Sequence, residues 1–136
     1  MPQEQPFDRK NILGLNYVSL YFVDLKQAVE FYSKVLGKPD IDTGDGKITG
    51  WKTGTTWLSV FPAKGGTRSD QNPCNCEFAI QVKTHQQVDE LHDAFVAAGA
   101  KSSWKPEDTE MYEPMRFAAI DDPFGVRVDI YCPIKK

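Results

Sequence analysis

The chain has 136 residues, of which 40% are hydrophobic and 26% are charged, and its formal net charge is −3. This length suits one domain with a full core, and the acidic balance gives no electrostatic basis for binding nucleic acid or an anionic membrane. The absence of a long apolar run and of a signal-peptide pattern, together with three cysteines (Cys74, Cys76 and Cys132), predicts a cytoplasmic protein with reduced thiols.

The first half of the chain predicts a strand, a helix and then further strands. Residues 1–12 are polar and without a period, so they are expected to form a tail. Residues 15–23 are rich in β-branched and aromatic side chains, which favours a strand. Asp24 stands at an N-cap position with Gln27 three residues later, and Gly37 is placed to end the helix. An extended piece at 38–41 and strands at 47–53 and 56–61 complete this half.

The second half repeats this order after a polar connection at 63–75. Thr84 and Gln87 have the spacing of a second capping box, and Gly99 is placed to end the second helix. The expected strands are 77–82, 101–105, 115–121 and 126–131, the last two joined by a turn from Asp122 to Gly125. The repeat predicts an α+β fold, in which modules at about 13–65 and 74–134 form one domain over 13–136.

Three segments carry a resemblance to a known family. They are Tyr17–Leu25, Phe31–Gly37 and the Asp-Pro-Phe-Gly turn with its following strand, residues 122–130. In order, spacing and duplication these segments resemble the glyoxalase, bleomycin-resistance and extradiol-dioxygenase group, the vicinal oxygen chelate superfamily. The resemblance implies two tandem βαβββ modules that form a half-barrel cup, with the helices outside and a ligand cavity inside. It also implies a homodimer, in some members with modules exchanged between chains.

Strand alternation predicts which side chains line this cup. If Val18, Leu20 and Phe22 pack under the first helix, their alternating neighbours face the opposite side of the sheet. A concave face lined by aromatic residues and a few polar groups is typical of a ligand pocket. The predicted ligand-binding residues are Tyr17, Tyr21, Trp57, Ser59, Phe61, Glu77, Arg127, Asp129 and Tyr131, with Trp51 as a further candidate.

Metal-dependent members of the family carry their ligands at four corresponding positions, which the resemblance places at Tyr17, Ser59, Glu77 and Asp129. Phenol and hydroxyl groups are poor ligands at neutral pH, and neither histidine of the chain lies at these positions. The expectation is therefore a cup without a metal or other cofactor. The alternative is a divalent cation bound by Glu77 and Asp129.

The two carboxylates, Glu77 and Asp129, leave two chemical interpretations open. They could act as acid and base, because burial and mutual repulsion separate the pKa values of neighbouring carboxyl groups. The preferred interpretation is structural: the carboxylates pair with Arg116 or Arg127, or accept a hydrogen bond from Tyr17.

The leading functional hypothesis is a protein that binds a small, apolar or aromatic molecule. The rival hypothesis is an enzyme of the same superfamily, a lyase, isomerase or dioxygenase, with Glu77 and Asp129 as its candidate catalytic residues. A third hypothesis is an interaction module whose cup is closed. Residues 107–114 are interpreted as a loop, either a lid or a simple surface loop, and the histidines and cysteines as surface or packing residues.

Overall fold

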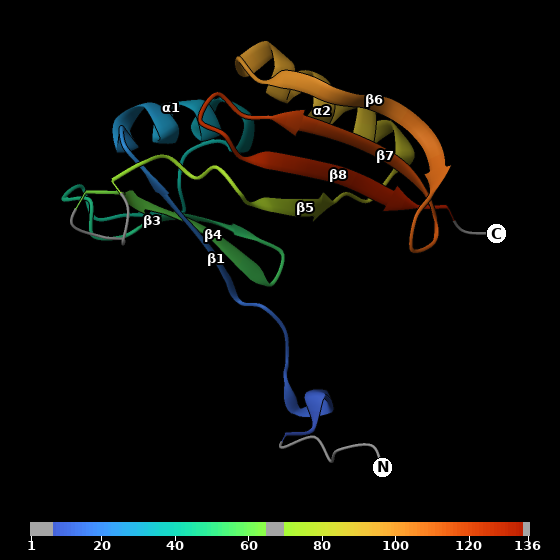
Figure 1. The fold of residues 1–136 in the computed structure, drawn as a ribbon, viewed down its shortest axis with the longest axis horizontal. Coiled ribbons are helices and arrows are strands. Elements are labelled where there is room, and N and C mark those ends of the chain that lie inside the picture. Colours follow the sequence, from blue (N-terminus) through green and yellow to red (C-terminus); the bar gives the residue numbers. More distant parts are fainter. Residues whose placement is uncertain (1–6, 65–69, 135–136) are drawn as a thin grey trace.

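The protein is an α+β fold of two βαβββ modules, each a four-stranded mixed sheet with one helix packed on it (Figure 1). The computed structural model describes residues 7–64 and 70–134, so the predicted tail and the predicted connection at 63–75 lie partly outside the described residues. The first module contains β1 (Tyr17–Phe22), α1 (Leu25–Leu36), β2 (Ile41–Asp42), β3 (Thr49–Thr53) and β4 (Thr56–Pro62). The second contains β5 (Glu77–Gln81), α2 (His85–Ala98), β6 (Lys101–Glu110), β7 (Pro114–Asp121) and β8 (Arg127–Pro133).

Both helices begin and end where the sequence predicts. The Asp24 side chain accepts a hydrogen bond from the backbone N–H of Gln27, and Thr84 and Gln87 form a complete capping box. Gly37 ends α1 with φ at 83° and Gly99 ends α2 with φ at 121°, backbone conformations that favour glycine. No helix among the described residues is long and apolar enough to cross a membrane.

The two sheets have equivalent strand orders, β1-β4-β3-β2 and β5-β8-β7-β6. In each sheet the first strand pairs in parallel with the last strand of its module, and the other pairs are antiparallel. Each first strand, β1 or β5, is therefore an edge strand that is hydrogen-bonded on one side within the described chain.

A single core joins the two modules through their helix-facing sides. Phe31 of α1 stacks on Phe95 of α2 with ring centroids 6.1 Å apart, and Phe22 meets Phe124 edge to face at 5.2 Å. The predicted helix-facing residues Val18, Leu20 and Phe22 lie in this core or against it. The same core contains Leu58 and Val60 of β4, Val128 and Ile130 of β8, and Val126 just before β8. The buried Trp51 also belongs to this core and donates its indole N–H to the Gly37 carbonyl at 2.7 Å, so its predicted place in the cup is wrong.

The prediction of a long loop at residues 107–114 is also wrong. The strand β6 continues to Glu110 and β7 begins at Pro114, so the turn between them consists of 111–113. Pairing with β7 holds this polar segment as an edge strand. The strand is irregular, because its register shifts twice, between Ser102 and Trp104 and between Trp104 and Glu107.

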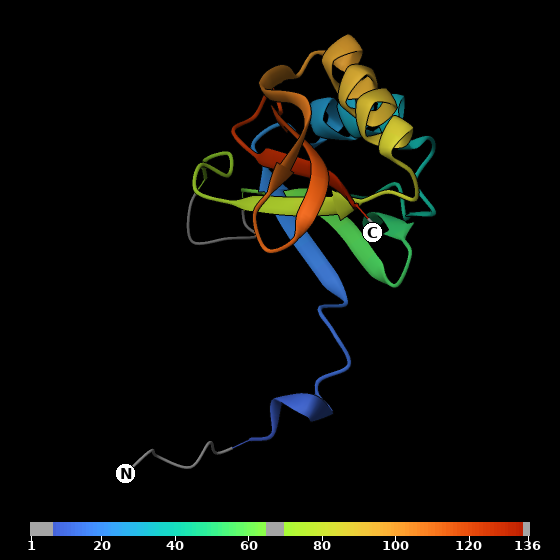
Figure 2. The same ribbon diagram turned by 90° about the vertical axis from the view of Figure 1, so that its right-hand side faces the viewer.

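The segment before β1, residues 7–16, extends away from both modules (Figures 1 and 2). It contains a short 3-10 turn at Arg9–Asn11, which begins with the Asp8 side chain accepting the backbone N–H of Lys10. We call this segment the arm. Its last residues are fixed to the first module, because Trp57 donates its backbone N–H to the Asn16 carbonyl at 2.7 Å.

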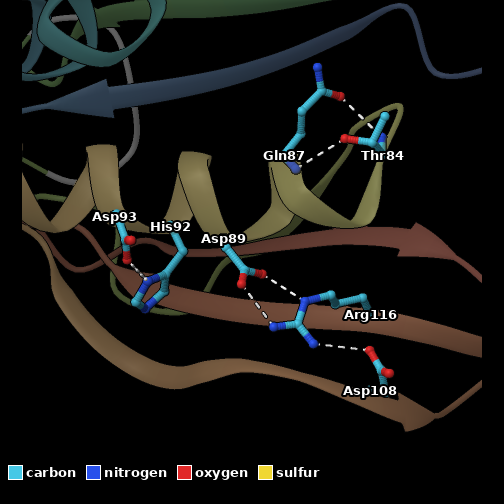
Figure 3. A network of polar contacts seen from close by, with 7 residues as sticks. All are labelled: Thr84, Gln87, Asp89, His92, Asp93, Asp108 and Arg116. Atoms are coloured by element: carbon cyan, nitrogen blue, oxygen red, sulfur yellow. Dashed lines mark hydrogen bonds and ion pairs between the residues drawn. The ribbon is translucent and has the colours of Figure 1, made fainter.

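The second module has an ion-pair network centred on Arg116 of β7, on the side of the sheet that α2 covers (Figure 3). The Arg116 guanidinium binds both carboxylate oxygens of Asp89 in α2, at 2.7 and 2.8 Å, and Asp108 in β6 at 3.0 Å. These bonds hold the pKa of the Asp89 carboxyl below its ordinary value. The network leaves Arg116 on the helix side of the sheet, so the expected pairing of Arg116 with Glu77 or Asp129 is wrong.

Replacing Arg116 by alanine is expected to lower the free energy of unfolding by about 1 kcal/mol at pH 7, because the paired side chains are only partly buried. Since the pKa of Asp89 is lowered in the folded state, this contribution is lost as the pH falls through that lowered pKa. Urea denaturation at pH 7 and at pH 3 measures it, with Arg116→Lys as the control that keeps the charge and loses the bidentate geometry. Equal stability of Arg116→Ala and the unaltered protein at pH 7 would contradict this assignment.

Candidate functional site

The first sheet presents an aromatic face on the side away from α1. Strand pairing places Tyr17 beside Trp57 and Tyr21 beside Phe61, whose rings stack with centroids 5.2 Å apart. The ammonium group of Lys52 lies 5.6 Å from the centroid of the Trp57 ring. Tyr17 is 66% exposed, so this face offers aromatic surface to a partner molecule instead of closing on itself.

Ser59 lies in the middle of the same face and is buried. Its strand neighbours are Ser19 in β1 and Gly50 in β3. A Cβ atom at Gly50 would lie 3.0 Å from the Leu58 carbonyl oxygen and 3.3 Å from the Ser59 hydroxyl. Glycine therefore leaves the hydroxyl uncovered from that side.

The second sheet presents a charged and apolar face. In strand register, Glu77 lies beside Arg127 and Gln81 beside Tyr131, whose hydroxyl group donates to the Gln81 side-chain oxygen at 3.2 Å. Arg127 forms an ion pair with Asp121 at 2.9 Å. An apolar cluster of Met115, Phe117 and Ala119, with Tyr131 against it, covers the remainder of the face.

Asp129 occupies the centre of this second face. Its strand neighbours on both sides are alanines, Ala79 and Ala119, so no long side chain from either neighbouring position covers it. One of its carboxyl oxygens, Oδ1, is buried and has no hydrogen-bond partner in the described chain. Burial, followed by the contact with the Glu77 carboxyl and its negative charge, raises the pKa of Asp129 to about 7, and the positive charge of Arg127 opposes the shift. Asp129 is therefore a carboxyl group that can hold or release a proton near neutral pH.

A cleft of about 1460 Å³ lies between the two modules and is lined by residues of β1 and β4 on one side and of β5 on the other. Trp57 of the first sheet and Glu77 of the second both line it, so two of the predicted ligand-binding residues from different modules share one hollow. The other predicted residues, Ser59 and Asp129 among them, lie on the open faces described above and do not line this cleft.

The donor set at the four positions inferred from the family does not fit a metal ion. Only Glu77 and Asp129 supply carboxylates, and both belong to the second sheet, whereas Tyr17 and Ser59 supply neutral oxygens from the first. Within residues 7–64 and 70–134 no cluster of three or more histidine, cysteine, aspartate or glutamate side chains is placed to hold a metal. Divalent cations prefer several carboxylate, imidazole or thiolate ligands together.

Alternation places Ala79 on the cup face, but the sequence did not identify Ala119 as the second neighbour of Asp129, nor the apolar cluster of Met115 and Phe117. Alternation along Met115–Asp121 was the available signal, because it places Met115, Phe117, Ala119 and Asp121 on one face. The histidines are surface or packing residues, as expected: His92 is buried and contacts Ser102 and Asp93, whereas His85 is exposed, with a ring nitrogen 3.1 Å from the Pro133 carbonyl oxygen. All three cysteines are free.

Residues 14–130 match the protein family described as "Glyoxalase/Bleomycin resistance protein/Dioxygenase superfamily". A glyoxalase-related enzyme from Fulvimarina pelagi shares 18% sequence identity and a TM-score of 0.71, over 89% of this chain and 88% of its own. A glyoxalase/bleomycin resistance protein/dioxygenase family enzyme from Burkholderia phytofirmans PsJN shares 23% identity and a TM-score of 0.69, over 88% and 98%. A lactoylglutathione lyase from Agrobacterium tumefaciens shares 23% identity and a TM-score of 0.68, over 89% and 94%. No curated protein sequence matches the chain, and at these identities the solved structures establish a common fold.

Proposed function

We propose that this chain, which belongs to the Glyoxalase/Bleomycin resistance protein/Dioxygenase superfamily, binds a small apolar or aromatic molecule without a metal ion. The observation that carries the proposal is the aromatic surface of the first sheet, where Tyr17 is exposed and Tyr21, Trp57 and Phe61 are partly exposed. Exposed rings on a rigid sheet bury large areas at low conformational cost when a planar ligand stacks on them. Ser59, Glu77, Arg127, Asp129 and Tyr131 then supply the polar contacts that orient the ligand.

The donor set supports the metal-free form of this proposal, since the four positions combine two neutral oxygens with two carboxylates from a single sheet. Elemental analysis of protein purified without added ions is expected to show less than stoichiometric metal. The metal-free proposal would be overturned if the unaltered protein contained one metal ion per chain and the Glu77→Gln and Asp129→Asn variants each lost this metal ion.

Ligand binding can be tested with the neutral aromatic dye Nile red. The Trp57→Ala variant is expected to bind the dye at least tenfold more weakly than the unaltered protein, because it removes the largest ring of the exposed face. Dye fluorescence during titration measures the dissociation constant. Val96→Ala is the matched control, since Val96 is 40% exposed on α2, away from both faces. Equal loss of affinity in both variants, or none in Trp57→Ala, would contradict the assigned surface.

An enzymatic function of the same site is the second candidate, and the raised pKa of Asp129 favours it. A carboxyl group that titrates near pH 7 can act as a general acid or base, with Glu77 as its partner. Turnover of a 2-oxo-aldehyde thiol adduct or a catechol, abolished by Asp129→Asn in a folded protein, would support this candidate. If the protein turns over neither substrate, the enzymatic candidate fails for these reactions and ligand binding stays the proposed function.

We further propose that the protein acts as a homodimer in the cytoplasm. The exposed apolar side chains of the arm, and the exposed ring of Tyr17 beside it, support a second copy as partner. The three free thiols support a reducing compartment.

A further inference from the structure

The arm carries the most exposed aliphatic side chains of the described chain. Leu13 is 101% exposed and Leu15 is 81% exposed, and Phe7 and Ile12 are each more than half exposed. All four lie on a segment that extends away from the sheets (Figures 1 and 2). Single exposed apolar residues are common on protein surfaces, whereas a run of them marks an interaction site.

The cleft between the modules has the properties of a site for such a segment. Its walls include the half-buried apolar side chains of Val18, Phe78, Ile80 and Val82. Its volume of about 1460 Å³ exceeds the roughly 300–1,000 Å³ that a small-molecule pocket occupies. The strands β1 and β5 flank it, and each pairs on one side only within the described chain. An unpaired strand edge is a template for an added strand.

We propose that the arm of one copy of this chain inserts into the cleft of a second copy, beside β5, and that the second copy reciprocates. The two surfaces are different parts of the same chain, so two-fold symmetry pairs both arms with both clefts at once. This inference rests on the homodimer proposed above and names its interface.

The geometry of the arm supports exchange between copies. The arm leaves the first module at the mouth of the cleft, where Leu15 lines the wall and its carbonyl accepts the Thr56 hydroxyl hydrogen at 3.0 Å. From this anchor it extends outward, so it would have to reverse direction to fill its own cleft. With its 3-10 turn at Arg9–Asn11 opened on docking, the nine residues 7–15 would span about 30 Å, and the five residues of β5 span about 17 Å. The arm is therefore long enough to run along the whole free edge of β5 in a partner.

The exchange has a consequence for the candidate site. Trp57 and Glu77 line the same cleft, so the arm of the second copy lies beside both residues and screens them from water. The hollow that the two modules share is then completed by the partner.

Sedimentation velocity over a range of concentrations tests the proposal with a Leu13→Asp/Leu15→Asp variant. The matched control is Met111→Asp/Tyr112→Asp, which changes two exposed side chains in the β6–β7 turn, where Tyr112 is 100% exposed. The unaltered protein and the control are expected to form dimers, whereas the arm variant is expected to dimerise at least 100-fold more weakly. Circular dichroism melting checks that the arm variant is folded.

Disulfide trapping then locates the arm. Two proteins are mixed in a Cys74→Ser/Cys76→Ser background, one carrying Leu13→Cys and the other Ile80→Cys. A mixed disulfide dimer is expected, and its absence from a mixture that forms dimers would overturn the proposed docking site. A dimer that persists in Leu13→Asp/Leu15→Asp would overturn the role of the arm alone. A monomeric unaltered protein would overturn the homodimer as well. The Nile red comparison of Trp57→Ala with Val96→Ala has its own control, so a failure of the ligand-binding proposal can be told apart from a failure of the arm exchange.

Discussion

Replacing Asp122 by alanine is expected to lower the free energy of unfolding by about 4 kcal/mol, because it removes four hydrogen bonds from a buried position. The Asp122 Oδ1 atom accepts the backbone N–H groups of Phe124, Gly125 and Val126, each at 2.8 Å. Its Oδ2 atom accepts the Tyr32 hydroxyl hydrogen at 2.7 Å. Burial, and then Asp122 itself, raises the pKa of Tyr32, so this hydroxyl group remains a donor. Urea denaturation followed by tryptophan fluorescence measures the loss.

The neighbouring residue provides the matched control for this prediction. Asp121 forms a partly exposed ion pair with Arg127, so Asp121→Ala is expected to cost at most about 1 kcal/mol. Tyr32→Phe removes only the hydrogen bond between the modules and should fall between the two aspartate variants. If Asp122→Ala were no more harmful than Asp121→Ala, Asp122 would not be the organising residue of the turn.

At pH 8 the Asp129→Asn variant is expected to be more stable than the unaltered protein by about 2 kcal/mol. The pKa of Asp129 rises from an ordinary value of 3.8 to about 7 in the folded state, so the native carboxyl holds its proton more tightly than the unfolded chain does. The unaltered protein therefore loses stability as the pH rises from 4 to 7 and is constant above that range. The full shift would correspond to about 4 kcal/mol, and partial exposure of the group reduces this by about half.

The stability difference between Asp129→Asn and the unaltered protein should vanish near pH 4, where both carry a neutral side chain at this position. Chemical denaturation at pH 4, 6 and 8 measures the difference. Asp121→Asn is the control with the opposite sign, because it loses an ion pair with Arg127 and should be less stable at pH 8. A difference that does not change with pH would show that Asp129 does not titrate near neutrality.

The sequence was sufficient to predict the two helices, because their ends are determined by residues close to them in the chain. The caps at Asp24 and Thr84 and the glycines after each helix act within a few residues, so they can be identified without tertiary information. Alternation likewise identified the buried face of β1 correctly, because Leu20 and Phe22 pack beneath α1. The order of elements followed from these local signals, whereas the family was indicated by the resemblance of three segments and is shown by the match over residues 14–130.

Features that depend on distant contacts could not be predicted from the sequence. The strand β6 is polar along most of its length, and its pairing with β7 determines its conformation more than its own composition does. Trp51 was a candidate for the cup, yet strand pairing places it beside the helix-facing Leu58, where its indole N–H binds the Gly37 carbonyl and its ring is buried. The setting of Asp129 depends on Ala79 and Ala119, which lie 50 and 10 positions away along the chain and become neighbours only through strand pairing.

Because the two modules share one core, neither module of this duplicated chain can be separated without exposing core residues. The hydrogen bond between Tyr32 and Asp122 joins residues 90 positions apart, and the contact between Phe31 and Phe95 crosses the same boundary. Either module alone would leave these rings in water, so a separated half of this chain would need a second module as its partner. In the intact chain that pairing is covalent, and its stability does not depend on protein concentration.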